Sequence, residues 1–429
     1  MPQVQHQEFD LTSGEPLPSV TRRTGLRRVL WAIAGAFVGA QVSVTLALII
    51  IASVRKLRAP VHGFPHSRNS EVKVQGNYLR VYTYGRELYD AMLEAINAAH
   101  SHIYMESYIW KADDVGEEFK EALAKKAAEG VEVYVIFDNV GNLVVPDSFK
   151  KFPKPINAMR FTAVHHWWHY FDPRRYVLDH RKILVVDDEI AFVGGYNIGS
   201  LYATQWRDTH LRLSGPDVVD FSYSFVEFWN RFCSHERRIA HRTVRRFEPT
   251  ITLHLNDALH LTFPIRNMYI DAIERAQRHI YLTTAYFIPD HVMLDSLKRA
   301  VSRGVDVQIL LPWTSNHVLA DWAAHGYFSE CLAAKIRIFG FKQAMIHAKT
   351  CTIDGEWSTI GTANIDRLSS VGNFEINTEI YDAKLAEQME AIFESDKSNA
   401  FELTTADWER RPWYVKASER LLAPLRILL

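Results

Sequence analysis

One short pattern, His-x-Lys-x4-Asp, occurs twice in this 429-residue chain, and the two copies stand 167 positions apart. The first copy runs through His180, Lys182 and Asp187, and the second through His347, Lys349 and Asp354. A single copy is weak support for a site, because three residue types at a fixed spacing arise easily by chance. Two copies in matching surroundings predict two similar halves that build one site.

An amide and a carboxylate follow each histidine at matching distances. Asn197 and Asn364 both stand 17 positions after their histidine, and Asp208 and Glu375 both stand 28 positions after it. Two residues before each asparagine the chain has a small residue, Gly195 in the first half and Thr362 in the second. We interpret these six positions, the two histidines and the two lysines as one constellation, because independent matching context sharply reduces the risk of a chance motif.

Each motif is predicted to lie on a strand, over residues 183–186 and 350–353. Residues two apart on a strand point to one face, so we expect the histidine and the lysine of each copy to project together. The motif aspartates, Asp187 and Asp354, each start the turn after the strand. They belong to the candidate catalytic set, but we interpret both as more structural than catalytic.

These residue types fit phosphoryl transfer. A neutral imidazole can attack phosphorus and form a covalent intermediate, and a carboxylate at the other ring nitrogen orients it. Two lysines can hold the charged phosphate oxygens, to which asparagine amides can also donate. A second histidine can pass protons between the leaving and the accepting oxygens. We expect no metal and no cofactor, because none of these steps needs one.

The chain reads as an α/β protein with a repeated plan. Residues 95–104 resemble residues 272–281, and each stretch leads into an amphipathic helix that ends at a glycine, Gly130 or Gly304. A nearly continuous apolar strand follows, over residues 131–137 and 305–311, which is typical of sheets covered on both faces. We predict two similar layered α/β domains in a pseudo-two-fold arrangement, at residues 55–240 and 241–429. The basic stretch between them, residues 237–249, is interpreted as a solvated linker, with contact to anionic lipid as the alternative.

One segment is not globular in character. Residues 29–54 carry no charge and exceed the roughly 20 residues that cross a bilayer core. We predict a retained single transmembrane helix, because the stretch is too long for a signal-peptide core; a cleaved signal and a buried core helix are the alternatives. Basic residues flank both ends, so the orientation stays open. Residues 1–28 are predicted to be a disordered tail.

Bulk properties exclude two classes. The formal net charge is −1, which gives the chain no field to gather nucleic acid. Its three cysteines, Cys233, Cys331 and Cys351, are odd in number and widely spaced, so neither a disulfide framework nor a CxxC metal site is expected. We expect a membrane partner and no nucleic acid; the oligomeric state stays open.

These residues resemble the phospholipase D superfamily, and within it the bacterial cardiolipin synthases. The narrower resemblance is carried by residues 106–110, 180–197, 206–209, 285–289 and 361–367, and the likeness covers roughly residues 70 to 425. It implies a metal-independent enzyme of the bacterial inner membrane that joins two phosphatidylglycerol molecules into cardiolipin and glycerol.

The resemblance also implies roles for the residues. His180 is expected to be the nucleophile and His347 the acid and base, with Asp208 the partner of His180 and Glu375 the partner of His347. The asparagines, Gly195 and Thr362 are expected near the substrate phosphate. Many relatives carry a serine where this chain has Thr362, and the first half has a glycine, so a hydroxyl survives in one half only.

Two further segments have open interpretations. Residues 165–171 hold three histidines and four aromatic residues. An aromatic loop at a lipid interface and a plain packed loop are the alternatives, with a metal site through His165 and His169 the least supported. The C-terminal segment from Trp413 onward is expected either to lie in the interface or to dock on the second domain.

Rival functions are a phospholipase D that uses water as the acceptor, a nuclease of the same superfamily, and an inactive membrane tether.

Overall fold

The computed structural model describes residues 21–58, 63–164, 167–172, 176–342 and 344–424. The chain forms two compact units, Met1–Arg58 and Ala59–Leu429. In the first unit, the helix α1 spans Thr21–Arg58. Residues 21–28 are therefore helical, so the part of the predicted disordered tail that covers them is wrong; the rest of that tail, residues 1–20, lies outside the described residues. Within α1, Arg27–Ile51 has a mean hydropathy of 2.1 and is long enough to cross a membrane.

The first half of the second unit is built on one eight-stranded sheet, with the strand order β1-β2-β9-β7-β6-β3-β4-β5. The strands β3, β4 and β5 run parallel to one another, and the other neighbours are antiparallel. The elements of this half are β1 (Val72–Val74), β2 (Asn77–Tyr82), α2 (Gly85–Ala98), β3 (His102–Ser107), α3 (Asp114–Ala128), β4 (Glu132–Asp138), β5 (Ile156–Phe161), η1 (Trp167–Phe171), β6 (Ile183–Val186), β7 (Ile190–Gly194), α4 (Ser200–Thr204), β8 (Trp206–Arg207), β9 (His210–Ser214), α5 (Val218–Phe232) and η3 (His235–Arg237).

The second half repeats this plan with a sheet in the order β10-β17-β16-β15-β11-β12-β13-β18. Here β11, β12 and β13 are the parallel strands. The elements are β10 (Ile251–Asn256), α6 (Pro264–Arg275), β11 (His279–Thr283), α7 (His291–Ser302), β12 (Asp306–Pro312), α8 (Val318–Ala333), β13 (Arg337–Phe341), β14 (Met345–Ile346), β15 (Thr350–Ile353), β16 (Trp357–Gly361), α9 (Arg367–Val371), β17 (Glu375–Tyr381), α10 (Ala383–Ser398), β18 (Ala400–Glu402), α11 (Thr405–Glu409) and α12 (Trp413–Leu422). The sequence prediction of a repeated α/β fold is confirmed.

The helices α3 and α7, which precede the predicted apolar strands, have clear start and stop signals. Asp113 and Asp290 cap α3 and α7 by accepting from the backbone N–H groups of Gly116 and Met293. Both helices end at a glycine with a φ of +93°, a left-handed conformation that glycine adopts without steric cost. The apolar strands that follow, β4 and β12, begin one residue later than the sequence predicts.

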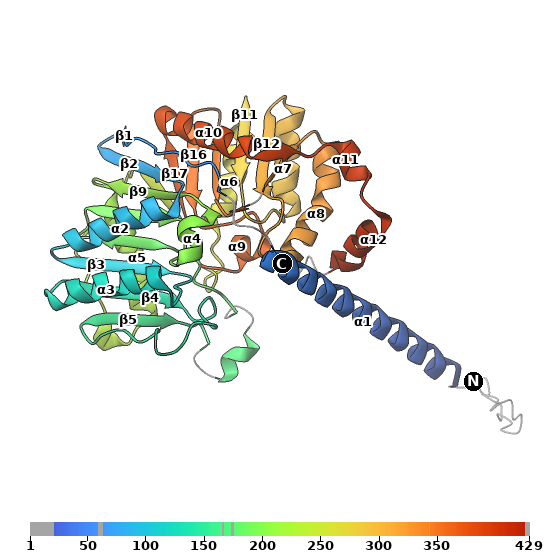
Figure 1. Ribbon diagram of the computed structural model, residues 1–429, viewed down its shortest axis with the longest axis horizontal. Helices are drawn as coiled ribbons and strands as arrows, with labels where there is room; N and C mark the ends of the chain where they lie inside the picture. The colour runs from blue at the N-terminus through green and yellow to red at the C-terminus, as the bar shows by residue number, and fades with distance from the viewer. Residues whose placement is uncertain (1–20, 59–62, 165–166, 173–175, 343, 425–429) are drawn as a thin grey trace, which may run out of the picture. The chain divides into compact units, whose positions relative to one another are not determined.

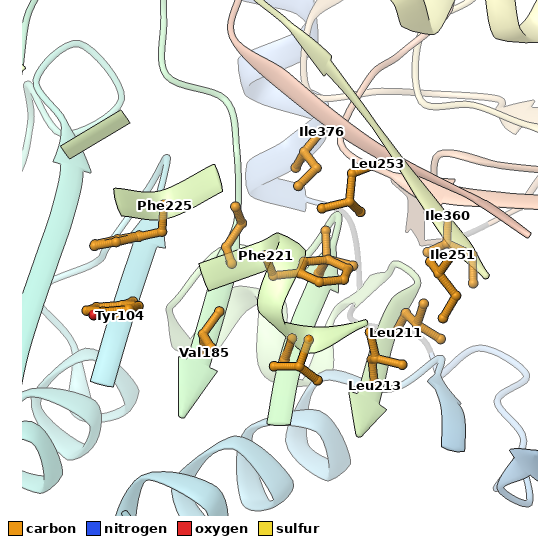
Figure 2. Packing of buried hydrophobic residues seen from close by; sticks show 14 of the residues in the cluster. Tyr104, Val185, Leu211, Leu213, Phe221, Phe225, Ile251, Leu253, Ile360 and Ile376 are labelled. Carbon is orange, nitrogen blue, oxygen red and sulfur yellow. The ribbon is translucent and has the colours of Figure 1, made fainter. Parts of the chain in front are cut away.

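The two sheets share one hydrophobic core. Figure 2 shows Phe221 and Phe225 of α5 and Leu211 of β9 in one cluster with Ile251 of β10 and Ile360 of β16. Each fully buried side chain of this size contributes roughly 1.5–3 kcal/mol relative to an exposed one. Each predicted domain range holds one sheet, and the shared core makes the stability of each half depend on the other. Whether residues 55–240 and 241–429 are the true boundaries stays a prediction.

The connection between the halves is held to the first half by its cations. Arg237 donates to the carbonyl of Ala158 at 3.0 Å, and Arg246 donates to Asp217 at 2.9 Å. These contacts occupy two of the basic side chains that the lipid interpretation of this stretch would have used.

Topology brings the motif segments to one edge of each sheet. In the first half, the parallel strands β3, β4 and β5 end at the edge where β6 begins and β7 ends. In the second half, β11, β12 and β13 end at the edge where β15 begins and β16 ends. Figure 1 shows the turn η1 standing out from the body beyond the ends of β4 and β5. The site is built where these two edges meet.

Candidate active site

The motif histidines lie just before the strands and not on them. The strands β6 (Ile183–Val186) and β15 (Thr350–Ile353) have the predicted bounds, so a shared strand face is not what brings each histidine and lysine together. In the second half the two side chains are nevertheless close, with Nζ of Lys349 2.6 Å from Nδ1 of His347. Each lysine turns back to its own histidine: the ammonium of Lys182 donates to the carbonyl oxygen of His180 at 2.7 Å, and that of Lys349 donates to the carbonyl of His347.

The carboxylates are paired across the halves. Nδ1 of His180 lies 3.0 and 2.9 Å from the two carboxylate oxygens of Glu375, and Nδ1 of His347 lies 2.7 Å from Oδ2 of Asp208. The expected pairing, Asp208 with His180 and Glu375 with His347, is therefore wrong: each acid serves the histidine of the other half.

Backbone contacts explain the crossed pairing. The N–H of His180 donates to the carbonyl of Phe374 at 3.0 Å, and the N–H of His347 donates to the carbonyl of Arg207 at 2.6 Å. Phe374 and Arg207 directly precede the two acids. Each histidine segment is thus clamped beside the carboxylate of the opposite half, and the parallel pair β14–β8 continues the second clamp.

The small residues at equivalent positions support the acids rather than a substrate. The hydroxyl of Thr362 donates to Glu375 at 2.5 Å, so it orients this carboxylate. A side chain at Gly195 would place its Cβ 2.0 Å from Oδ1 of Asp208, which already occupies that space. Glycine is required there because Asp208 fills the room that a hydroxyl would need.

The pKa values of the two acids shift in opposite directions. Burial would raise the pKa of Asp208, but Lys349 and His347 outweigh it and the pKa is lowered. Burial raises the pKa of Glu375, against the opposing effects of Lys182 and Thr362. Burial also lowers the pKa of both histidines, to about 3 for His347, so their rings are neutral at neutral pH in the protein alone.

The two lysines are buried ammonium groups beside the histidines. Burial lowers the pKa of Lys182 to about 7 and that of Lys349 to about 8, with the two acids acting in the opposite direction. Each lysine is at most 2% exposed. A buried cation gains most from an anion brought next to it, and this favours a phosphodiester as the ligand.

The two asparagines differ. Oδ1 of Asn197 accepts from the backbone N–H of Ile109 at 3.2 Å, so this atom holds the loop after β3. Oδ1 of Asn364 is buried and has no hydrogen-bond partner within the described part of the chain. An unsatisfied buried polar atom is costly, and Asn364 is therefore the better candidate for a substrate contact.

The motif aspartates are structural, in agreement with the interpretation from the sequence. The carboxylate of Asp187 accepts from three consecutive backbone N–H groups, those of residues 100–102, at 2.7–2.8 Å. Asp354 does the same for residues 277–279 at 2.8–2.9 Å. Both have a φ of 56° in a tight hairpin turn. They tie this turn to the start of the neighbouring strand, at the edge opposite the site.

Aromatic rings line the histidines. The ring of Tyr108 meets His180 edge-on with centroids 4.8 Å apart, and Trp206 and Tyr286 lie 5.1 and 6.3 Å from His347. The sequence placed these residues in the resembling segments without assigning them a role.

Two buried ion pairs were missed by the sequence reasoning. Arg181, between His180 and Lys182, binds Glu106 through contacts of 2.6–2.9 Å. Arg207 binds Asp396 of the second half at 2.8 and 2.7 Å. In both cases the arginine is next to a site residue in the sequence and lies near apolar residues. This combination was the sequence signal that could have predicted a buried ion pair.

The two segments that the sequence left open, residues 165–171 and the C-terminal segment, have different outcomes. His165 lies outside the described residues, and nothing is described of the side chain of His169. In the portion of the chain that was searched, no three His, Cys, Asp or Glu side chains gather as for a metal ion. The C-terminal helix α12 packs against α8, which confirms docking on the second half.

Comparisons with known proteins identify the family of the chain. The family described as "Cardiolipin synthase, PLD-like domain" matches residues 92–229 and 269–397. The chain is similar to the major cardiolipin synthase of Bacillus subtilis, with 32% identity over 83% of this chain and 77% of the relative. It is similar to the cardiolipin synthase of Clostridium perfringens, with 31% identity over 84% and 79% of the two chains. The solved structure of a phosphatidylserine synthase from Haemophilus influenzae has a similar fold, with a TM-score of 0.62, 14% identity and coverage of 82% and 93%.

Proposed function

Because the chain belongs to the cardiolipin synthase family with phospholipase D-like domains, we propose that it transfers a phosphatidyl group from one phosphatidylglycerol to another and releases glycerol. The observation that carries the proposal is the crossed site. Two histidines, each oriented by a carboxylate of the opposite half, flank two buried lysines.

In the first step, Nε2 of His180 attacks the phosphorus of phosphatidylglycerol, and the bond from phosphorus to the headgroup glycerol oxygen breaks. Contact of both Glu375 oxygens with Nδ1 favours the tautomer that leaves a lone pair on Nε2. Nε2 of His347, as imidazolium, gives its proton to the departing oxygen. The phosphodiester anion and ionised Asp208 stabilise that imidazolium against the effect of burial.

In the second step, His347 accepts the proton of a terminal hydroxyl on a second phosphatidylglycerol. The oxygen of that hydroxyl attacks phosphorus, the phosphorus–nitrogen bond breaks, and His180 is restored as cardiolipin forms. Lys182 and Lys349 hold the non-bridging phosphate oxygens through both steps. The Oδ1 of Asn364, which has no partner among the described residues, can accept from a hydroxyl of the substrate, and its amide N–H can donate to a phosphate oxygen. Thr362 acts by orienting Glu375, and Gly195 acts by leaving room for Asp208.

We also propose that α1 is a single-pass anchor in the bacterial cell membrane. Its length, its hydropathy and the lipid substrate of the family support this placement. An anchor keeps the enzyme at the surface where both phosphatidylglycerol molecules reside.

The test gives the purified full-length protein in detergent phosphatidylglycerol as its sole lipid, followed by mass spectrometry of the products. Cardiolipin with released glycerol is expected. Phosphatidic acid with no cardiolipin would mean that water is the acceptor and that the protein is a phospholipase D. No lipid product would favour an inactive tether, and cleavage of added DNA without lipid turnover would favour a nuclease.

The assignment of roles is tested separately with His180→Ala and His347→Ala. Both variants are expected to lose turnover of phosphatidylglycerol. With a labelled phosphatidyl donor that carries a p-nitrophenol leaving group, which needs no proton, the label should remain on His347→Ala but not on His180→Ala. His260→Ala, at an exposed surface histidine, is the matched control and should keep full activity. Label retained on His180→Ala alone would exchange the two roles.

A further inference from the structure

Exposed apolar side chains gather at the edge of the second unit that carries the site. We define the apolar rim as six exposed residues on segments at this edge: Leu143, Val144, Trp167, Phe171, Leu368 and Val371. Four of them are strongly exposed, at 65%, 83%, 71% and 79% for Leu143, Val144, Trp167 and Phe171. Large apolar side chains so exposed, on neighbouring loops of one edge, mark an interaction surface.

Topology places the rim around the site. Leu143 and Val144 follow β4, and Trp167 and Phe171 follow β5, whose parallel ends lie at the edge where the His180 segment meets the sheet. Figure 1 shows η1, which carries Trp167 and Phe171, standing out from that side. In the second half, α9 carries Leu368 and Val371 and ends four residues before Glu375.

A basic hollow lies in the same loop region. It has a volume of about 390 Å³ and is lined by Lys150, Lys151 and Arg160 with a single acid, Asp147. The three cations exceed the one carboxylate, which lies 3.3 Å from Lys150 and 3.9 Å from Arg160. Aromatic residues and surplus positive charge on loops of the same edge suit the interface of an anionic bilayer, where rings insert among headgroups and cations meet phosphates.

The covalent chain tethers the second unit to α1. The helix α1 ends at Arg58, and Phe64 is already buried in the core of the second unit. Six residues span at most about 20 Å whatever course they take. This reach tethers Phe64 to the end of α1, and so to the membrane if α1 spans it as proposed.

We propose that the apolar rim docks on an anionic lipid bilayer, so that the site takes its lipid substrate directly from the surface. This inference rests on the proposed function and on the anchor, and it deepens both by naming a second contact with the membrane. The rim holds the edge at which His180 and Glu375 meet against the headgroup layer, where a phosphatidyl group lies within reach.

The test places an environment-sensitive fluorophore on the full-length protein in nanodiscs of phosphatidylglycerol and phosphatidylcholine. The label is attached at Phe171→Cys on a Cys233→Ser background, because the other two cysteines are buried. The matched control is Tyr381→Cys, which is 57% exposed at the opposite edge of the second sheet. A blue shift and quenching by brominated lipid are expected at Phe171→Cys and not at Tyr381→Cys.

Equal emission at the two positions would overturn the proposal. A blue shift without quenching by brominated lipid would also overturn it, because a protein surface would then cover the rim. This readout needs no turnover, so a failure of the proposed reaction does not affect it.

Activity gives a second, independent test. The variant Trp167→Ser with Phe171→Ser is expected to lose roughly tenfold in kcat/KM on bilayers while keeping its rate on monomeric short-chain phosphatidylglycerol. Tyr381→Ser should change neither rate. Equal losses on both substrates would assign these rings to the folding of the site and overturn their role in docking.

Discussion

The buried pair of Arg207 and Asp396 predicts a large and specific loss of stability. The two side chains are 1% and 3% exposed, and two contacts of 2.8 and 2.7 Å join them across the halves. Arg207→Met leaves the carboxylate of Asp396 buried without its cation. Removing one partner of such a pair costs about 3–5 kcal/mol, because the desolvated charge that remains has no compensation.

The size of the effect on melting follows from the size of the second unit, Ala59–Leu429. An unfolding entropy of about 2.1 cal/mol/K per residue gives about 0.8 kcal/mol per K for this unit. The predicted cost therefore lowers Tm by about 4–6 °C. The double variant Arg207→Met with Asp396→Leu should recover most of this loss, because two apolar side chains of similar volume replace the pair without leaving a charge.

The assay is thermal unfolding in one detergent at one scan rate, since unfolding of a protein of this size need not be reversible. Arg337→Met is the matched control: Arg337 also binds its partner, Glu402, through two contacts, but both side chains are over 40% exposed. Such a pair contributes about 1 kcal/mol or less, so the shift should be within about 1–2 °C. Equal shifts for the two arginine variants, or no recovery in the double variant, would refute the reasoning.

Three further predictions concern the site. Glu375→Gln and Asp208→Asn should each lower kcat by about 10–100-fold. A substrate with a p-nitrophenol leaving group needs no proton from His347, so it should restore formation of the phosphatidyl-enzyme in the Asp208 variant. It should not do so in the Glu375 variant, because Glu375 orients the nucleophile His180. Because a lysine loses its charge as pH rises through its pKa, kcat/KM should fall above about pH 7–8, where Lys182 and Lys349 deprotonate; a profile that stays flat to high pH would contradict this. Asp354→Ala should cost about 1–3 kcal/mol by leaving backbone N–H groups without their acceptor, seen as a lower Tm with kcat nearly unchanged.

Much of the fold and of the site was predictable from the sequence, because the signals were local. Turn residues, helix stops and strand runs are set by neighbouring residues, and the start of β4 and β12 was placed within one residue. The site residues gather because both motifs lie at the same edge of a repeated sheet. Repetition of a local pattern was enough for this result.

The partner of each histidine was not predictable in the same way. Counting from His180 to Asp208 measures distance along one half, whereas the contact of His180 with Glu375 arises from how the two halves dock. The pair Arg207–Asp396 joins residues 189 positions apart for the same reason. The way the two halves dock depends on how their side chains fit in the shared core. A single sequence does not show how the two sheets align there.

The crossed contacts also make the two halves inseparable as a catalyst. Each half contains a histidine and an acid, yet the acid of a half never touches the histidine of the same half. A polypeptide cut within the connection near residues 237–249 would therefore give two inactive fragments, whatever the quality of each sheet. Activity regained on mixing them would measure reassembly of the interface itself, which makes turnover a reporter of how the halves find each other.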